Sequence, residues 1–452
     1  MPDPFRFLRG LVFAAGFAGT LATVVLPAHA QGMNVLRDTE TEEMLRSYEM
    51  PLARAAGLDV NNVHVYLMGS PEINAFATQP QDIYIFSGML LWLRKPNELI
   101  GVMAHETGHL SAGHLTRSEY AMKKAAIPMM VSLIAGIAAM IAGAGEVGMA
   151  IMGIGQSYAM AQMAAFTRVQ ESTADQIAAK LLLATHQSPL GMYDTFQRFA
   201  QEEAMSAYKI DKFAVDHPTG QDRVGALQDL VESSPYREVP DSPQSLHTFQ
   251  MVQAKLAGYV LPVKETLRRF PLSDTSKPAR YARAMAYMRQ PDFQKALAEI
   301  NSLIKDEPDN PYFYEVRGQI YVSMARPREG IPDYQKAVDL RPSAPLLRQE
   351  LATAQLATDD TSLAGDALKN LKAALLAEND DMFTWYQTAQ AYSSLDNKPM
   401  ADLSTAELYY HGGDMRRALV FAMRARGGLN QGTPDWQRAS DIISATAAMA
   451  RQ

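Results

Sequence analysis

Residues 105–109 read His-Glu-Thr-Gly-His, and this short stretch says more about fold and chemistry than any other part of the chain. Because His105 and His109 lie four residues apart, a helix places both on one face. Two imidazoles at this spacing chelate a zinc ion, and Glu106 between them can act on a water molecule as general base. Pro96 suits the first turn of such a helix, and no other proline follows up to about residue 115. The stretch predicts a helix carrying a catalytic site with one zinc ion per chain.

A catalytic zinc ion needs a third protein ligand and an open position for water. His114 is the nearest candidate along the chain. It follows His105 by nine residues, however, which on a continuous helix is about half a turn away in angle. We interpret His114 as a histidine at the helix terminus rather than as a zinc ligand.

A second helical pattern, from about residue 162 to 183, offers a better third ligand. Glu171 and Asp175 share one face of this helix, and the small residues Ala174 and Ala178 permit close approach of a neighbouring helix. We expect Glu171 to complete the zinc ligands. Asp175 would accept the free N–H of a zinc-bound histidine and so fix its tautomer.

His-Glu-x-x-His followed by Glu-x-x-Ala-Asp at 171–175 resembles the gluzincin metallopeptidases of the CAAX-prenyl-protease type, which include HtpX. Asn74-Ala75-Phe76-Ala77 is similar to the strand region before the zinc helix in that family. Thr78-Gln79-Pro80-Gln81 departs from the Pro-Gly-rich turn of relatives, which affects the loop shape and not the metal site. The resemblance implies an α+β, mostly α, gluzincin domain with a small sheet and zinc as cofactor.

The same resemblance extends to His217-Pro218 and Arg223, which match the downstream His-Pro…Arg motif of the family. It implies two alternatives for His217. His217, with Arg223, could donate hydrogen bonds to the oxyanion of the tetrahedral intermediate. Alternatively, His217 could act as a latch that occupies the open zinc position, as the matching histidine can in exported relatives.

Two stretches before the zinc helix alternate like strands: residues 63–68, and Ile83-Tyr84-Ile85-Phe86. Family members are thought to bind substrate as an extra strand on the sheet edge, which implies a substrate-binding role for Ile83, Tyr84, Ile85 and Phe86. The alternative is that these strands only pack beneath the helices.

The N-terminus has the layout of a secretory signal peptide. Two arginines precede an uncharged apolar run from residue 11 to 27, and Ala28-His29-Ala30 predicts cleavage after Ala30. An uncleaved anchor is the alternative. Cysteine is absent, which suits an oxidising periplasm. The net charge of −7, without a basic aromatic stripe, argues against nucleic-acid binding.

Breaks rich in proline and serine near residues 233–243 predict two domains, a peptidase domain at 31–245 and a second domain at 246–452. Within the first, residues 125–163 contain a single charged side chain, Glu146. We expect a helical hairpin that covers the protease or touches the outer membrane. A true membrane span is the alternative.

The second domain shows an internal period of thirty-four residues. Ala284 and Tyr287 recur as Gly318 and Tyr321, and a later copy, after an insertion, has Ala389 and Tyr392. The pattern resembles the tetratricopeptide repeat in roughly four degenerate copies, which implies an all-α solenoid that binds protein. A generic helical domain is the alternative.

These observations predict an exported periplasmic zinc metalloendopeptidase with a repeat domain for docking. The resemblance to exported, repeat-bearing family members implies the β-barrel assembly machinery as docking partner and misfolded or stalled outer-membrane proteins as substrates. Two rivals remain. One is a chaperone or assembly factor whose zinc site is latent, and the other is a protease embedded in the membrane.

Overall fold

The computed structural model describes residues 34–141, 145–205, 217, 221–358 and 360–449. The chain forms two compact units, Met33–Leu261 and Pro262–Gln452. The predicted signal peptide and its cleavage after Ala30 lie outside the described residues.

A four-stranded sheet lies at the centre of the first unit, in the order β1-β2-β4-β3. Its strands are β1 (Val35–Leu36), β2 (His64–Met68), β3 (Ala75–Thr78) and β4 (Asp82–Phe86). β2 and β4 are parallel, whereas β1 and β3 run antiparallel to their neighbours. The predicted strands are present as β2 and β4. Within the described residues, β3 is an edge strand of the sheet and contacts the predicted zinc helix.

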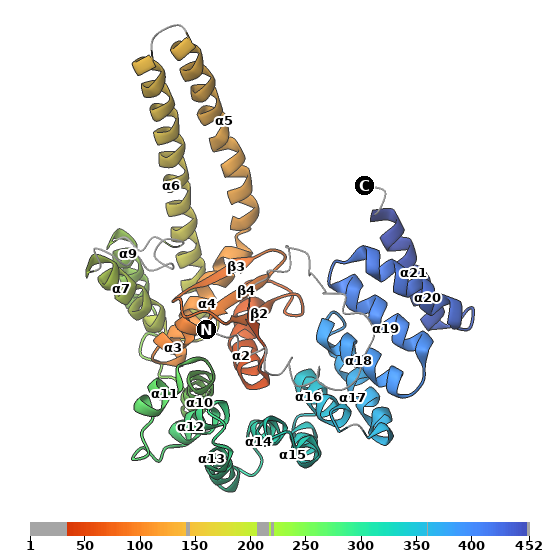
Figure 1. Ribbon diagram of the computed structural model, residues 1–452. Coiled ribbons are helices and arrows are strands. Elements are labelled where there is room, and N and C mark those ends of the chain that lie inside the picture. Colours follow the sequence, from red (N-terminus) through yellow and green to blue (C-terminus); the bar gives the residue numbers. More distant parts are fainter. Residues whose placement is uncertain (1–33, 142–144, 206–216, 218–220, 359, 450–452) are drawn as a thin grey trace. The chain divides into compact units, whose positions relative to one another are not determined.

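Helices pack around this sheet and supply the site residues (Figure 1). They are α2 (Thr39–Ala55), α3 (Ser87–Trp92), α4 (Pro96–Ser111), α5 (His114–Ile141), α6 (Gly145–Ala184), α7 (Leu190–Met205), α9 (Gln221–Glu232) and α10 (Pro243–Val260). The helix α4, which carries the His-Glu-Thr-Gly-His stretch, packs against α2, α6, α7 and β3. It is buried from Pro96 to His109.

The boundary between the units falls at residue 261, later than the predicted 245, because α10 packs onto the peptidase unit. The Gln253 side-chain amide donates hydrogen bonds of 2.7 Å to the carbonyls of Leu90 and Leu93. The buried Lys255 forms an ion pair with Asp38 at the start of α2. The proline and serine breaks before residue 243 therefore mark the loop that leads into α10 rather than a domain boundary.

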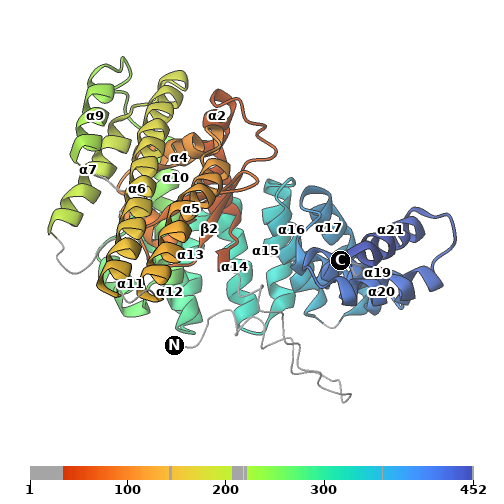
Figure 2. The same ribbon diagram turned by 90° about the horizontal axis from the view of Figure 1, so that it is seen from above.

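The helices α5 and α6 form an antiparallel hairpin that extends beyond the sheet (Figure 1), and they lie side by side in both views (Figure 2). The hairpin agrees with the helical prediction for residues 125–163, although α6 begins at Gly145 and continues without a break to Ala184. Among the described residues, no helix combines the length and the apolar character needed to cross a membrane.

The second unit begins with α11 (Val263–Arg269) and continues with helix pairs in which each helix contacts the next. The pairs are α12–α13 (Lys277–Arg289, Phe293–Asp306), α14–α15 (Pro311–Ser323, Pro327–Leu340), α16–α17 (Pro345–Leu356, Ala364–Ala377), α18–α19 (Met382–Ser394, Lys398–His411) and α20–α21 (Met415–Gly428, Pro434–Met449). Thus the described residues hold one pair more than the predicted four.

Small residues let the repeat helices approach closely, as their recurrence suggested. A Cβ atom on Gly330 would lie 3.0 Å from the carbonyl oxygen of Gly318, and one on Gly318 would lie 2.8 Å from the Tyr334 ring. The last pair uses alanines instead, with Ala418, Ala422 and Ala425 fully buried. The fold-class prediction is confirmed: a mostly helical peptidase unit with a small sheet precedes an all-α repeat unit.

Candidate metal centre

Three elements bring together the side chains of His105, His109, Glu171 and His217. The two histidines from α4 face Glu171 of α6, and His217 approaches from the segment before α9. All four side chains are buried, and their potential ligand atoms lie within 4.8 Å of one another. The chain thus gathers into one cluster residues that are more than a hundred positions apart in sequence.

The close contact between α4 and α6 depends on the small residues at the crossing. Gly108, between the two α4 histidines, lies so near α6 that an added Cβ atom would be 2.8 Å from the carbonyl oxygen of Ala174. Ala174 and Ala178 are fully buried. Since any larger side chain at this crossing would push the helices apart, Gly108 and Ala174 set the distance between Glu171 and the histidines.

The spacing of the four ligand atoms fits a zinc ion. Nε2 of His105 lies 3.0 Å from Nε2 of His109, 3.3 Å from Nδ1 of His217 and 3.3 Å from Oε2 of Glu171. A tetrahedral zinc with bonds of about 2.0–2.1 Å separates its ligand atoms by about 3.3 Å. Because all these atoms direct lone pairs into one buried point, a cation makes the arrangement favourable.

The environment of the Glu106 side chain also fits a metal site. Its side chain is 1% exposed, and neither carboxylate oxygen has a hydrogen-bond partner within the described residues. The nearest ring nitrogen is Nε2 of His217, 3.6 Å from Oε1. An orphaned buried carboxylate beside a set of metal ligands is what a general base for water requires.

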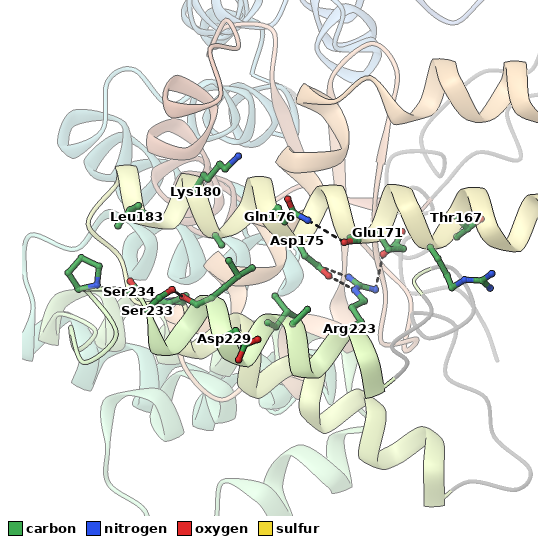
Figure 3. A pocket seen from close by; sticks show the side chains of 18 of the residues that line it. Thr167, Glu171, Asp175, Gln176, Lys180, Leu183, Arg223, Asp229, Ser233 and Ser234 are labelled. Carbon is green, nitrogen blue, oxygen red and sulfur yellow. Dashed lines mark hydrogen bonds and ion pairs between the residues drawn. The ribbon is translucent and has the colours of Figure 1, made fainter.

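Asp175 and Arg223 surround the cluster on the side of α6 and α9. Oδ1 of Asp175 lies 3.0 Å from Nδ1 of His105, the ring nitrogen that faces away from the other ligands. The Arg223 guanidinium binds Asp175 through Nε and Nη2, at 2.5 and 2.8 Å, and Glu171 through Nη1 at 2.8 Å (Figure 3). These carboxylates and Arg223 also line a cavity of about 1020 Å³ between α6 and α9.

Burial and hydrogen bonds shift the pKa values of His105 and Glu171 in opposite directions, and the hydrogen bonds have the larger combined effect. Burial alone would lower the pKa of His105, but hydrogen bonds with Asp175 and Glu171 raise it to about 9. Burial would likewise raise the pKa of Glu171, yet hydrogen bonds with His105, His109 and His217 bring it far below the usual range of a carboxyl. Glu171 is therefore anionic at neutral pH, as a metal ligand must be.

A second buried carboxyl group, that of Glu49 in α2, forms a hydrogen bond with α4. The Thr107 hydroxyl donates a 2.7 Å hydrogen bond to Oε1 of Glu49 in α2. Burial is the main reason that the pKa of Glu49 is raised to about 8, with the nearby Glu106 adding to the rise. Glu49 is thus neutral at pH 7, so α4 is anchored without a further negative charge beside the site.

His217 and Arg223 make different contacts with the cluster. His217 directs Nδ1 at Glu171 and His105, and Nε2 at Glu106, so it lies among the ligands. Arg223 contacts the far side of Asp175 and Glu171. The guanidinium is engaged by these two carboxylates, and its position suits the orientation of Glu171 and Asp175.

The substrate-binding assignment of Ile83, Tyr84, Ile85 and Phe86 is corrected by the sheet order. These residues form β4, which is hydrogen-bonded to β2 on one side and to β3 on the other. A strand with both edges paired cannot accept a further strand. In the part of the chain that the structure describes, the sheet edge beside α4 belongs to β3 (Ala75–Thr78).

His114 lies at a helix terminus and outside the set of four potential ligands, whereas the predicted end of the zinc helix is wrong. The zinc helix ends at Ser111 instead of continuing to about residue 115, and His114 begins α5. Its side chain is buried, with Nδ1 3.0 Å from Nδ1 of His109. Burial and then the neighbouring His109 lower the pKa of His114 to about 4. The sequence signal for the end of the zinc helix before His114 is Gly113, because a glycine at this position permits a sharp turn.

Comparison with known proteins agrees with this geometry. Residues 39–231 match the profile of Peptidase family M48. The Beta-barrel assembly-enhancing protease of Escherichia coli (strain K12) is 24% identical over 406 residues, which cover 88% of this chain and 81% of that protein. The Putative beta-barrel assembly-enhancing protease of Vibrio cholerae is 25% identical over 297 residues, or 63% of this chain and 60% of that protein.

Metalloprotease LoiP of Escherichia coli (strain K12) is 28% identical over 189 residues, which cover 40% of this chain and 69% of that protein. This match extends over fewer residues than the first two. The predictions of enzyme class and cofactor are confirmed, since the family uses zinc and the cluster described above could hold it. Residues 39–231 are therefore similar to Peptidase family M48, and the chain is a zinc metalloendopeptidase.

Proposed function

We propose that this chain is an exported, periplasmic zinc metalloendopeptidase that degrades misfolded or stalled outer-membrane β-barrel proteins. The observation that carries the proposal is the cluster of His105, His109, Glu171 and His217 beside the orphaned carboxylate of Glu106. The place in outer-membrane assembly is supported by similarity over 88% of the chain to a protein named Beta-barrel assembly-enhancing protease.

In the proposed chemistry, His105, His109 and Glu171 hold the zinc ion. When bound, zinc supplies Lewis acidity that polarises the peptide carbonyl and lowers the pKa of water. Glu106 accepts the proton of the attacking water and delivers it to the leaving amine. Asp175 accepts the Nδ1 proton of His105, which leaves Nε2 free for the metal, and Arg223 fixes both carboxylates of α6.

His217 gives the proposed enzyme a latent resting state. Because its Nδ1 atom shares the ligand cluster and its Nε2 atom faces Glu106, the imidazole lies between the metal position and the general base. Substrate and water need that position. We infer that His217 is a removable fourth ligand, and the expected consequence of removing it is given in the Discussion.

We propose that substrate binds as a strand along β3, in place of the earlier assignment to β4. β3 is an edge strand that contacts the zinc helix α4, so a peptide paired with Ala75–Thr78 would run beside the cluster. Pairing through the backbone makes recognition weakly dependent on sequence. It requires an extended, unpaired segment, and such segments are exposed in unfolded β-barrel proteins and hidden in folded ones.

This substrate preference leads to the first expected result. The purified chain should cleave a urea-denatured outer-membrane β-barrel protein diluted into buffer, and should leave the same protein intact once it has folded in detergent. Cleavage would be followed by gel electrophoresis over time. A chain without the zinc-chelating cluster, such as one carrying His105→Ala, serves as the control for contaminating proteases. Equal cleavage of the folded and unfolded forms would contradict selection through an unpaired strand.

The repeat unit is proposed to dock the enzyme onto a protein partner, by resemblance the β-barrel assembly machinery. Paired helices that stack through small residues present a continuous surface to other proteins. Exposed large apolar side chains occur on this unit at Phe383, Leu376 and Met423, among others. Because these side chains are exposed rather than packed between the repeat helices, they are available for apolar contact with a partner.

The hairpin of α5 and α6 is proposed to contact a lipid surface. Large apolar side chains of α5 are exposed at neighbouring positions, as Met130, Val131, Leu133 and Ile134 show. Exposed apolar side chains on a helix can insert at the boundary between lipid headgroups and acyl chains. Basic residues are exposed toward the base of the hairpin, where anionic headgroups would meet them. These are Arg117, Lys124 and Arg168.

If the hairpin contacts lipid, the full chain should float with vesicles that contain phosphatidylglycerol in a density gradient. Replacing two exposed hairpin residues, Met130→Asn with Ile134→Asn, should abolish flotation, because both apolar contacts are lost without change to the peptidase core. The matched control is Leu272→Asn, an exposed leucine of the repeat unit. Flotation that persists in the double variant would contradict the proposal. Protein retained after alkaline washing of native membranes would favour the membrane-embedded rival.

A further inference from the structure

His114 contacts the metal cluster from behind His109. The two Nδ1 atoms are 3.0 Å apart, and the ring planes meet at 74° with the ring centroids 5.0 Å apart. Nε2 of His109 points the other way, toward Glu171 and His105. His114 therefore touches the one nitrogen of His109 that is not directed at the metal position, and it stands outside the set of four potential ligands.

The backbone brings this contact about through a break in the helix. On a continuous helix, residues five apart point in directions about 140° apart, so His109 and His114 could not meet. Here α4 ends at Ser111, and Gly113 adopts a φ of +63° before α5 begins at His114. A side chain on Gly113 would be strained in this conformation. The glycine thus turns the chain so that His114 folds back onto the zinc helix.

Two hydrogen bonds join the beginning of α5 to Gln170. The Gln170 side-chain amide donates to the His114 carbonyl over 3.0 Å, and the Ser118 hydroxyl donates to Oε1 of Gln170 over 3.0 Å. Gln170 is buried and directly precedes Glu171. The start of α5 is therefore tied to the part of α6 that supplies the third ligand of the proposed zinc site.

The proton between the two rings has one placement compatible with a metal ligand. Two ring nitrogens at 3.0 Å must share one proton, since two N–H groups would repel and two lone pairs would leave the contact unmade. When Nε2 of a neutral His109 binds zinc, its proton is on Nδ1. Nδ1 of His114 must then be the acceptor, and the proton of His114 is on Nε2.

We propose that His114 is a positioning residue that accepts the Nδ1 proton of His109 and thereby fixes the ring for zinc binding. His114 does for His109 what Asp175 does for His105. The two zinc-helix histidines are thus oriented by different acceptors, a neutral imidazole and a carboxylate. The inference rests on the proposed role of His109 as a zinc ligand.

The test compares two replacements of His114 by their zinc affinity, measured by competition with a chromophoric chelator. His114→Leu keeps bulk but has no acceptor, and should weaken zinc binding by about 10–100-fold. In His114→Asn the side-chain oxygen can take the place of Nδ1, and affinity should stay within about threefold of wild type. Equal losses in both variants would overturn the proposal, because they indicate that His114 serves packing alone.

A second measurement on the unaltered chain does not depend on how the variants fold. Nitrogen NMR of the zinc-loaded protein, labelled at its nine histidines, reports which ring nitrogen carries each proton. The expected result is a proton on Nδ1 of His109 and on Nε2 of His114. A proton on Nδ1 of His114 would overturn the proposal. Failure of wild type to bind zinc would instead overturn the proposed function, so the two failures are distinguishable.

Discussion

Glu106→Gln should reduce cleavage of an unfolded protein by about 10²–10⁴-fold, the range that a general base contributes. The change is nearly isosteric, but an amide cannot accept the proton of the attacking water. Glu106 is buried, and its carboxylate has no hydrogen bond within the described residues, so the replacement breaks no such bond there. The rate would be measured with casein or a denatured β-barrel protein as substrate, at equal zinc loading of both proteins.

Zinc content is the control for this variant, because the proposed ligands remain in place. Cleavage at the wild-type rate in a zinc-loaded Glu106→Gln protein would contradict the assignment of the general base. The same variant separates protease from chaperone in cells. If it restored the outer-membrane integrity of a deletion strain in full, binding of clients rather than hydrolysis would be the main task of the chain.

His217→Ala should raise cleavage by about tenfold or more, since the active fraction of a latched enzyme is small and removing the latch raises it toward one. Three ligands remain in the variant, which is the number that a catalytic zinc site needs. The direction of the change discriminates between the two roles that the sequence left open. A latch predicts a rise, whereas an oxyanion donor predicts a fall.

The matched control for this experiment is His64→Ala, which removes an exposed histidine from the start of β2. It should cleave at the wild-type rate. Cleavage by His217→Ala that is equal to wild type or lower would contradict the latch.

The zinc helix could be predicted because its chemistry is local in sequence. Spacing of four residues fixes the faces of His105 and His109 whatever the surrounding fold. The partner helix with Glu171 was predicted for a related reason, since its small residues indicated a close crossing, and Gly108 meets Ala174 there. Patterns of period 3.6 over many residues are also why the repeat helices were predictable.

What failed depended on contacts between distant segments. The pairing of β4 on both edges results from β3, a strand of four residues whose length gives little periodic signal. The end of the zinc helix at Ser111 was missed because one backbone angle, at Gly113, redirects the chain. The last helix pair was missed since it packs through alanines and lacks the tyrosine that marked the other copies.

The central claim is that this chain binds one zinc ion through the cluster of His105, His109, Glu171 and His217. Elemental analysis of the purified chain, before and after dialysis against a chelator and with added zinc, measures this directly. We predict one zinc per chain in wild type and in Glu106→Gln, and none in a His105→Ala protein with unchanged helical content. A well-folded wild-type chain that retains no zinc after loading would contradict the account.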